Sequence, residues 1–161
     1  KWTDGKAPLG GPSEEVSQAC EAAVLEFEQH MHRFEIWAAM AQMDEFLRGI
    51  NKWWSSASRA ALNGDNPEQD IVSVLRDAFH YLRIASVLMH PIVPHGTELI
   101  YEYLDIVDHG SKEGRAGFFS WTHIFEPIDS WAEDAERQSG WFTLKEVPPR
   151  FDFFEKHPSQ L

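Results

Sequence analysis

The 161-residue sequence is poor in the features that mark secreted, membrane-bound or metal-dependent proteins. It contains one cysteine, Cys20, so it can form neither an internal disulfide nor a zinc site built from several thiolates. No run of apolar residues approaches the roughly 18 that a membrane span requires, and the first residues lack the apolar stretch of a signal peptide. We therefore expect no membrane association and a cytoplasmic location, because a chain without disulfides suits a reducing compartment.

Positive charge is also scarce. The chain has 14 lysines and arginines against 26 aspartates and glutamates, which gives a formal net charge of −12. A protein with this charge repels a polyanion over most of its surface. The acidic residues are concentrated in residues 1–50 and 96–139, whereas residues 51–95 carry four acidic and four basic side chains. Any contact with a nucleic acid is therefore expected where the acidic residues are fewest.

The motifs of common enzyme classes are absent as well. The sequence has no G-x-S-x-G elbow, no glycine-rich phosphate loop and no H-E-x-x-H metal motif. His30 and His32 are two residues apart and so point to different sides of a helix, while His90 and His95 are separated by two prolines. Cys20 falls on an apolar helical face, where a buried thiol is expected. We expect no catalytic residue, no metal site and no cofactor in this chain.

Apolar residues recur at helical spacing through much of the chain. Ser13 or Pro12 can cap a first helix that ends near 30–32, and the Asn63–Pro67 segment must form a turn. The His90-Pro91 pair should end one long helix, and Pro94 is well placed to start the next across the end of the bundle. The pattern predicts helices over about residues 13–32, 33–61, 67–89 and 94–104.

These helices predict an all-α fold, an antiparallel helix bundle with an irregular C-terminal extension. Residues 1–12 are expected to be a loop left from a longer chain, residues 13–108 the bundle, and residues 109–161 the extension packed on it. Within the extension we expect FSWTHIF to be extended and DSWAEDAERQ to be a short acidic helix. The residues expected to be buried together between the second and third helices are Phe34, Trp37, Ile50, Ile71, Leu75, Leu82 and Leu88.

Two adjacent tryptophans, Trp53 and Trp54, stand out in the neutral region. On a helix their side chains diverge by about 100°, so one can join the core while the other faces outward or sideways. Aromatic rings beside lysine, arginine and serine are used to stack on unpaired RNA bases, although an ordinary helix end has the same composition. The candidate RNA-binding residues are Lys52, Trp54, Ser58 and Arg59.

Three stretches carry a resemblance to a known family: NKWW at 51–54, ASVLMHPIVPHGTELIYEYL at 85–104 and FSWTHIFEPI at 119–128. In this order and spacing they resemble the helical anticodon-binding domain of class I aminoacyl-tRNA synthetases, and methionyl-tRNA synthetases most closely. The resemblance implies a tRNA anticodon stem-loop as partner. It also implies a parent methionine–tRNA ligase whose catalytic domain, which is not part of this chain, uses ATP.

The sequence departs from that family pattern at two places. The family's first helix carries an asparagine and an arginine that read the anticodon, and this chain is expected to start at the loop after that helix. A tryptophan that stacks on an anticodon base is expected about nine residues after Asn51, where this chain has Arg59 and Ala60. Trp54 is the nearest aromatic residue that can substitute for it.

Two functional hypotheses follow. The first is a tRNA anticodon-recognition module that docks the anticodon stem for the catalytic domain of the same parent chain. The second is a protein-interaction scaffold of synthetase ancestry that has lost RNA reading, which the missing tryptophan and the net charge of −12 favour. A free-standing metalloenzyme has no support from the spacing of ligands.

Overall fold

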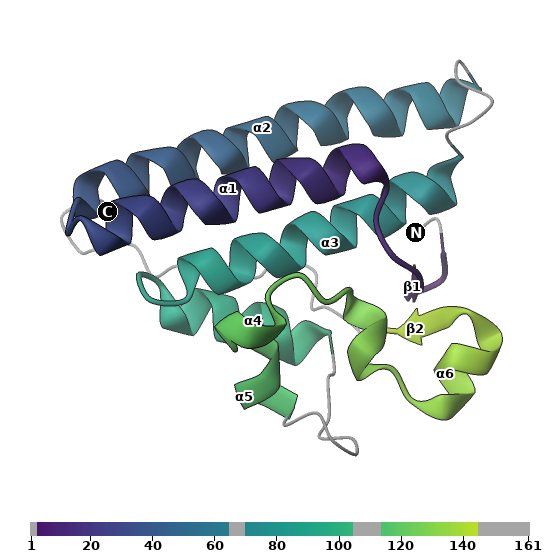
Figure 1. Ribbon diagram of the computed structural model, residues 1–161. Coiled ribbons are helices and arrows are strands. Elements are labelled where there is room, and N and C mark those ends of the chain that lie inside the picture. The colour runs from purple at the N-terminus through teal and green to yellow at the C-terminus, as the bar shows by residue number, and fades with distance from the viewer. Residues whose placement is uncertain (1–2, 65–69, 105–113, 145–161) are drawn as a thin grey trace, which may run out of the picture.

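Three long helices lie side by side and form the larger part of the molecule (Figure 1). The computed structural model describes residues 3–64, 70–104 and 114–144. The predicted all-α bundle is confirmed, because every described element except two three-residue strands is helical. The elements are β1 (Lys6–Pro8), α1 (Glu14–His32), α2 (Ile36–Asn63), α3 (Ile71–Met89), α4 (Pro94–Tyr103), α5 (Gly114–Phe118), η1 (Trp121–His123), η2 (Ile128–Trp131), α6 (Asp134–Ser139) and β2 (Trp141–Thr143).

The ends of the long helices follow the capping residues of the sequence. Ser13 is the N-cap of α1, and its backbone N–H and hydroxyl donate to the buried Asp77 carboxylate of α3 at 2.7 and 2.8 Å. Asp70 caps α3 by accepting a hydrogen bond from the Ser73 N–H at 2.7 Å. Gly64 closes α2 with a φ of 70°, the left-handed conformation that glycine adopts without strain. The Ser13–Asp77 contact also fixes the start of α1 on α3.

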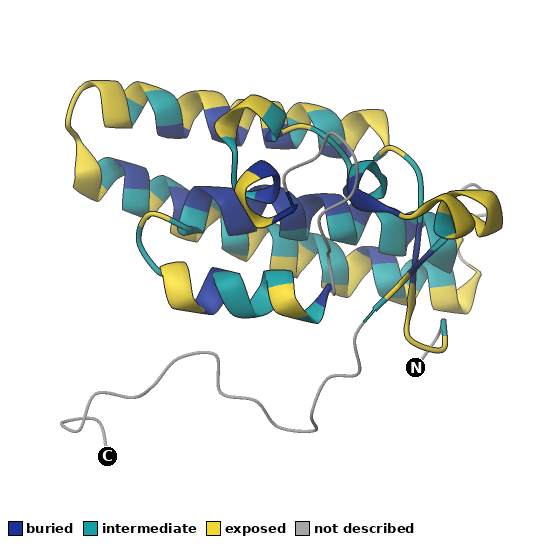
Figure 2. Ribbon diagram, turned by 90° about the horizontal axis from the view of Figure 1, so that it is seen from below, coloured by how far each residue is buried: buried dark blue, intermediate teal, exposed yellow. Residues whose placement is uncertain are grey.

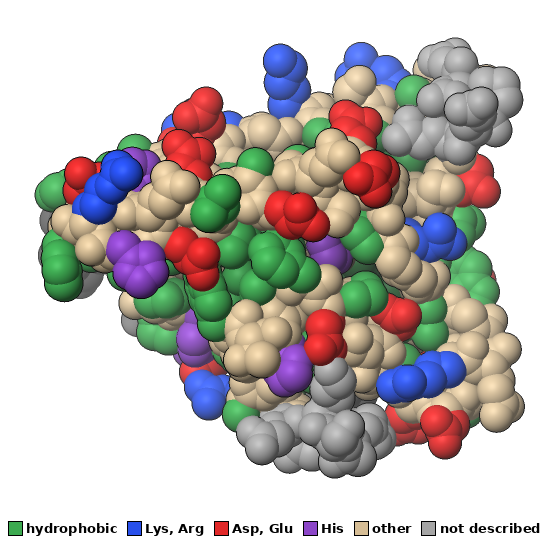
Figure 3. Space-filling model, viewed as in Figure 1, with side chains coloured by type: hydrophobic (Ala, Val, Ile, Leu, Met, Phe, Trp, Pro, Cys, Tyr) green, Lys and Arg blue, Asp and Glu red, His purple; other side chains and the backbone are tan. Residues whose placement is uncertain are grey.

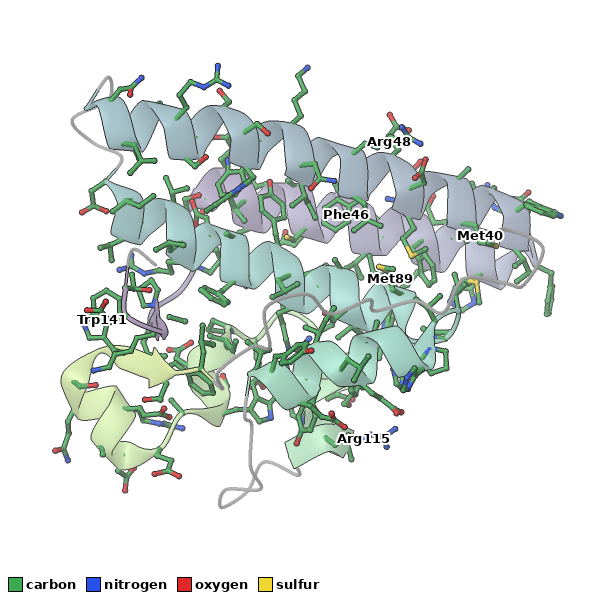
Figure 4. The ribbon with its side chains drawn as sticks, turned by 180° about the vertical axis from the view of Figure 1, so that it is seen from behind. Met40, Phe46, Arg48, Met89, Arg115 and Trp141 are labelled. Atoms are coloured by element: carbon green, nitrogen blue, oxygen red, sulfur yellow. The ribbon has the colours of Figure 1, made fainter. Side chains whose placement is uncertain are left out.

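The predicted break after α3 is confirmed. The helix ends at Met89, a turn carries the chain past Pro91, and Pro94 is the first residue of α4. The His90 ring stacks on the Phe119 ring at 3.9 Å between centroids and shares a 2.8 Å hydrogen bond with the Thr97 hydroxyl. The expected position of α4 was wrong, because the helix turns back along α3 rather than crossing the end of the bundle (Figure 4).

The C-terminal extension is more ordered than the sequence predicts. The FSWTHIF stretch at 119–125 is not extended, since it follows directly after α5 and contains the 3-10 helix η1. The acidic helix is confirmed as α6, which begins in a capping box formed by Glu133 and Glu136. Strand β2 pairs antiparallel with β1, with Ala7 opposite Phe142, inside a segment that was expected to be a loop. The expectations for residues 105–113 and 145–161 lie outside the described residues.

The buried residues form two clusters. Figure 2 marks the buried positions along the ribbon in dark blue. The first lies between α1, α2 and α3 and includes Cys20, Phe27, Met43, Tyr81 and Leu88. The second gathers the extension around the strand pair, and its members are Ala7, Leu104, Phe118, Ile128, Trp131, Ala132 and Phe142. The predicted burial of the Cys20 thiol is confirmed, and burial raises its pKa to about 12, so this thiol stays protonated.

Arg83 of α3 joins the two clusters. Its side chain is 0% exposed, and its guanidinium lies over the Phe118 and Trp131 rings at 4.7 and 4.8 Å from their centroids. It donates hydrogen bonds to the carbonyl oxygens of His123 at 2.9 Å and Ile124 at 3.5 Å. Burial lowers the pKa of this guanidinium to about 10, which leaves it charged at neutral pH.

Part of the predicted core was wrong. Leu88 is fully buried, but Phe34 and Trp37 are 88% and 84% exposed. The reason is that α2 begins at Ile36 rather than Arg33, and its buried stripe runs through Ala39, Met43 and Ala57. Trp37 lies two residues before Ala39 and therefore about 200° around the helix from it. The remaining predicted residues, Ile50, Ile71, Leu75 and Leu82, are half-buried. All of them except Ile71 line an apolar groove between α2 and α3.

Replacing Arg83 should loosen the extension from the bundle. Arg83→Ala removes the donor for two carbonyl groups and the cation over two rings, so we expect a loss of about 2–4 kcal/mol in the free energy of unfolding. Arg83→Lys should recover only part of this loss, because an ammonium group lacks the planar fork. Urea unfolding of both variants, with the exposed Arg48→Ala as control, checks the prediction. An unchanged midpoint for Arg83→Ala would show that the contact is dispensable.

His80 should make the fold sensitive to acid. The ring is buried, and its Nδ1 has no hydrogen-bond partner among the residues that the structure describes. Burial, with the charge of Arg83 adding to it, lowers the His80 pKa to about 4. The unfolded chain therefore binds the proton more tightly, so stability is complete above about pH 6.5 and falls as the pH decreases toward 4, by up to about 3 kcal/mol. In His80→Gln this part of the pH dependence should vanish. Parallel stability curves for both proteins between pH 7 and 4 would contradict the assignment.

Candidate nucleic-acid interface

The candidate residues lie on the C-terminal half of α2. Lys52 and Arg59 are seven residues apart, which is close to two helical turns, so both side chains point from one face. Both are exposed, and together with Ser55, Ser56 and Ala60 they line a shallow hollow of about 370 Å³. Lysine and arginine side chains stand out above α2 along the upper edge of the molecule (Figure 3). We call the five residues of this hollow the cationic face.

The cationic face carries uncompensated positive charge. Neither Lys52 nor Arg59 has a carboxylate partner among the residues that the structure describes. Arg48, one turn before Lys52, differs because its Nε donates to the Asp44 carboxylate at 2.7 Å. Figure 4 shows the Arg48 side chain pointing away from the bundle. Lys52 and Arg59 are therefore the cations on this part of α2 whose charge is available to an external anion.

Trp54 lies on a different face from the two cations. It is two residues from Lys52, about 200° around the helix, and with Trp53 it lines the groove between α2 and α3. The two indole rings are 6.5 Å apart, and the Trp53 ring meets the Tyr81 ring edge-on at 5.1 Å. Both tryptophans are half-buried; Trp53 packs against the first buried cluster, while Trp54 faces sideways onto the groove, which agrees with the expectation that only one of the two rings joins the core. The structure brings Lys52 and Arg59 together and places Trp54 at the rim of a neighbouring groove.

Ser58 is engaged with its own helix. Its hydroxyl donates to the Trp54 carbonyl oxygen at 2.6 Å, and Ser55 makes the same kind of bond to the Asn51 carbonyl at 2.9 Å. Serines inside helices commonly bond to the carbonyl four residues earlier, because that oxygen is within reach. The Ser58 hydroxyl can therefore still accept a hydrogen bond, but it donates to an external group only by giving up the backbone contact.

An apolar groove runs beside Trp54. Its first part, of about 430 Å³, lies between α2 and α3, and a second part of about 510 Å³ continues between α3 and α4. Leu47, Asn51, Phe79 and Leu82 line both parts. The groove explains why several residues expected in the core are only half-buried. Its signal in the sequence is the apolar helical spacing around Ile50, Leu75 and Leu82, which were predicted to be buried between the second and third helices.

Metal-binding and membrane-spanning features were also sought in residues 3–64, 70–104 and 114–144. In these ranges no three histidine, cysteine, aspartate or glutamate residues are grouped so that they could hold a metal ion. None of the helices in them has the length and hydropathy to cross a membrane. The notable chemistry of the α2 surface is thus cationic and aromatic, which suits contact with an anionic ligand that presents flat rings.

The long helices thus form a bundle with a proline break after the third helix and a cationic face on the second. The sequence matches the family profile described as "Anticodon-binding domain of tRNA ligase" over residues 14–146. The match covers α1 to β2 and therefore both buried clusters except Ala7. This chain belongs to the anticodon-binding domain family of tRNA ligases, as the resemblance of its motifs to class I synthetases implies.

Curated relatives point to ligases that are named for isoleucine. The chain is 27% identical over 81 residues to the cytoplasmic isoleucine–tRNA ligase of Mus musculus, which is 50% of this chain and 6% of that protein. It is 21% identical over 89 residues to the probable cytoplasmic isoleucine–tRNA ligase of Dictyostelium discoideum, which is 55% of this chain and 8% of that protein. It is 23% identical over 95 residues to the isoleucine–tRNA ligase of Tetrahymena thermophila, which is 58% of this chain and 9% of that protein.

The matched region thus spans less than a tenth of the length of these relatives. No solved structure matches the chain. The relatives support the class of enzyme that the motifs indicate, which is a tRNA ligase. All three are named for isoleucine, whereas the motifs resemble those of methionyl-tRNA synthetases. The amino acid is therefore taken up below as a proposal.

Removing the positive charges of Lys52 and Arg59 should weaken RNA binding and reduce the dependence of the affinity on salt concentration. Each phosphate contact with a single-stranded loop contributes about 0.7 to the slope of log affinity against log salt concentration. We expect Lys52→Gln with Arg59→Gln to lower that slope by about 1–2 for an anticodon stem-loop binding to the parent protein. The control is Arg48→Gln, which removes a cation already paired with Asp44. Equal slopes for the double variant and the unaltered protein would place the phosphate contacts elsewhere.

Proposed function

We propose that this chain is the anticodon stem-loop docking module of a class I tRNA ligase. The observation that carries the proposal is that a family match over residues 14–146 coincides with an unpaired cationic face on an otherwise acidic chain. The partners are tRNA and the catalytic domain of the same parent protein. The chemistry of amino-acid activation, with ATP, belongs to that catalytic domain, and this chain supplies no catalytic residue.

The distribution of charge gives the docking a physical logic. Lys52 and Arg59 attract phosphate groups, while the net charge of −12 repels the RNA from most other faces. Phosphate contacts fix the register of an RNA, and base contacts then provide specificity. Trp54, at the rim of the adjoining groove, is the ring that we propose for stacking on an unpaired base. Ser58, one turn further, accepts a hydrogen bond at the same edge.

The amino acid of the parent ligase has two candidates. We favour isoleucine, because the three relatives described above are all named as isoleucine–tRNA ligases. Methionine is the second candidate, on the resemblance of the NKWW and HPIVP segments to methionyl-tRNA synthetases. Two of the relatives are named as cytoplasmic enzymes, and we propose the same location for the parent of this chain.

The alternative function is a protein-interaction scaffold that no longer reads RNA. Its support is Ala60, which stands where the family has a stacking tryptophan, together with the strongly acidic composition. The two functions differ in one observable. A docking module binds an anticodon stem-loop with strong salt dependence, whereas a scaffold does not bind it at any salt concentration.

The stacking role of Trp54 can be tested in the parent protein. Trp54→Ala should reduce the affinity for an anticodon stem-loop by about 1–3 kcal/mol, the usual contribution of one aromatic–base stack, and Trp54→Phe should retain most of it. Aminoacylation of the cognate tRNA with isoleucine, and separately with methionine, identifies the amino acid. If the parent protein binds tRNA equally well with and without the Trp54 ring, Trp54 does not stack on a base and only lines the groove.

A further inference from the structure

The turn between α1 and α2 exposes an unusual amount of apolar surface. Phe34 and Trp37 are 88% and 84% exposed, and Ile36 and Met31 are exposed as well. Soluble monomers scatter single apolar side chains over their surface, but a contiguous group on one short segment marks an interaction site. We call residues 31–37 the aromatic turn. It lies at the left end of the bundle in Figure 1, and hydrophobic side chains gather at that end in Figure 3.

The backbone of the aromatic turn is held in a conformation that does not suit its residue. Phe34 has a φ of +59°, in the left-handed region that disfavours bulky side chains. Its N–H donates to the Met31 carbonyl at 3.1 Å, and the Glu35 N–H donates to the His30 carbonyl at 2.9 Å. The His30 ring also shares a 2.8 Å hydrogen bond with the Glu35 carboxylate. The fold thus keeps a strained phenylalanine pointing into solvent, and such strain concentrates at functional sites.

The charge around the aromatic turn argues for a protein partner rather than RNA. Residues 26–37 contain three glutamates and one arginine, so the segment repels phosphate. The Arg33 side chain has no partner in the part of the chain that the structure describes. Next to the turn is a hollow of about 420 Å³ lined by Met31, Pro91 and Trp121, among others. Protruding rings beside a hollow form a surface that fits another folded protein.

The position of the aromatic turn indicates which protein that is. Trp37 and Arg59 lie near opposite ends of α2, and their 22-residue separation corresponds to about 33 Å along the helix. The anticodon and the acceptor end of a tRNA are at opposite ends of that molecule. A ligase that holds the anticodon at the cationic face reaches its catalytic part most directly from the other end of this module, where the aromatic turn lies.

We propose that the aromatic turn docks into an apolar recess on the catalytic part of the same ligase, beside a carboxylate that pairs with Arg33. The inference rests on the proposed function, since it takes the cationic face as the anticodon end. It adds the surface through which the two parts of the enzyme hold their relative position. Phe34 and Trp37 are the anchors, and the hollow beside them receives a side chain from the partner.

Hydroxyl-radical labelling in the absence of tRNA tests the docking directly. The Phe34 and Trp37 side chains should be labelled at least fivefold less in the full-length parent than in this 161-residue chain alone. Leu25 is also exposed but lies on α1 away from the turn, and its labelling should be the same in both proteins. Equal labelling of Phe34 and Trp37 in both proteins overturns the proposal. Protection that depends on tRNA, or on the concentration of the isolated chain, also overturns it, because the partner is then RNA or a second copy.

Two variants separate docking from folding. Phe34→Asn suits the left-handed backbone and Trp37→Lys suits an exposed helix position, so neither should lower the melting temperature of the 161-residue chain. In the parent, each should lower kcat/KM for aminoacylation about tenfold or more and remove the protection from labelling, whereas Leu25→Lys should do neither. Stem-loop binding by the isolated chain should stay unchanged in all three variants. Loss of that binding would contradict the proposal that the RNA binds at the cationic face. A lower melting temperature would show that the aromatic turn stabilises the fold rather than docking to a partner.

Discussion

The fold depends on one buried cation. Arg83 places a guanidinium where water does not reach, between the three-helix cluster and the cluster of the extension. Two rings of the second cluster, Phe118 and Trp131, lie against it, and the carbonyl oxygens of His123 and Ile124 accept its hydrogen bonds. A buried charge of this kind tolerates few alternative arrangements, because an unpaired guanidinium in an apolar interior is costly. The extension is therefore attached to α3 in one position. With α4 turned back along α3, the apolar groove runs from between α2 and α3 to between α3 and α4.

This arrangement makes α2 a helix with distinct faces and distinct ends. One face contributes Ala39, Met43 and Ala57 to the core, and the opposite face presents Lys52 and Arg59 without carboxylate partners in the described chain. Between them, Trp54 lies at the rim of the groove. At the other end, the helix starts just after a strained Phe34. A single straight element thus carries the proposed RNA contact and the proposed contact with the catalytic part of the ligase, about 33 Å apart.

The sequence predicted what local chemistry decides. The three long helices, the break at His90-Pro91, the start of α4 at Pro94 and the burial of Cys20 follow from periodicity, capping residues and the backbone restrictions of proline. The exposure of Phe34 and Trp37 could not be predicted in this way, because an apolar residue at helical spacing reads as core whether or not a partner covers it. The pairing of β1 with β2 joins segments more than 130 residues apart, and three-residue strands leave no alternation to detect. At the candidate site, composition selected a segment of α2 on which Lys52 and Arg59 share one face, as helical spacing implies. The position of Trp54 on the groove could not be predicted, because it depends on how α2 packs against α3.

The central claim is that an anticodon stem-loop rests on the cationic face of α2. Photo-cross-linking tests it most directly: a stem-loop with 4-thiouridine in the anticodon loop is bound to the parent protein, irradiated, and the linked peptides are mapped by mass spectrometry. The account predicts cross-links within residues 51–60, with Trp54 among the linked positions. Cross-links confined to the extension or to the aromatic turn, with none on α2 beyond Ile50, would contradict it.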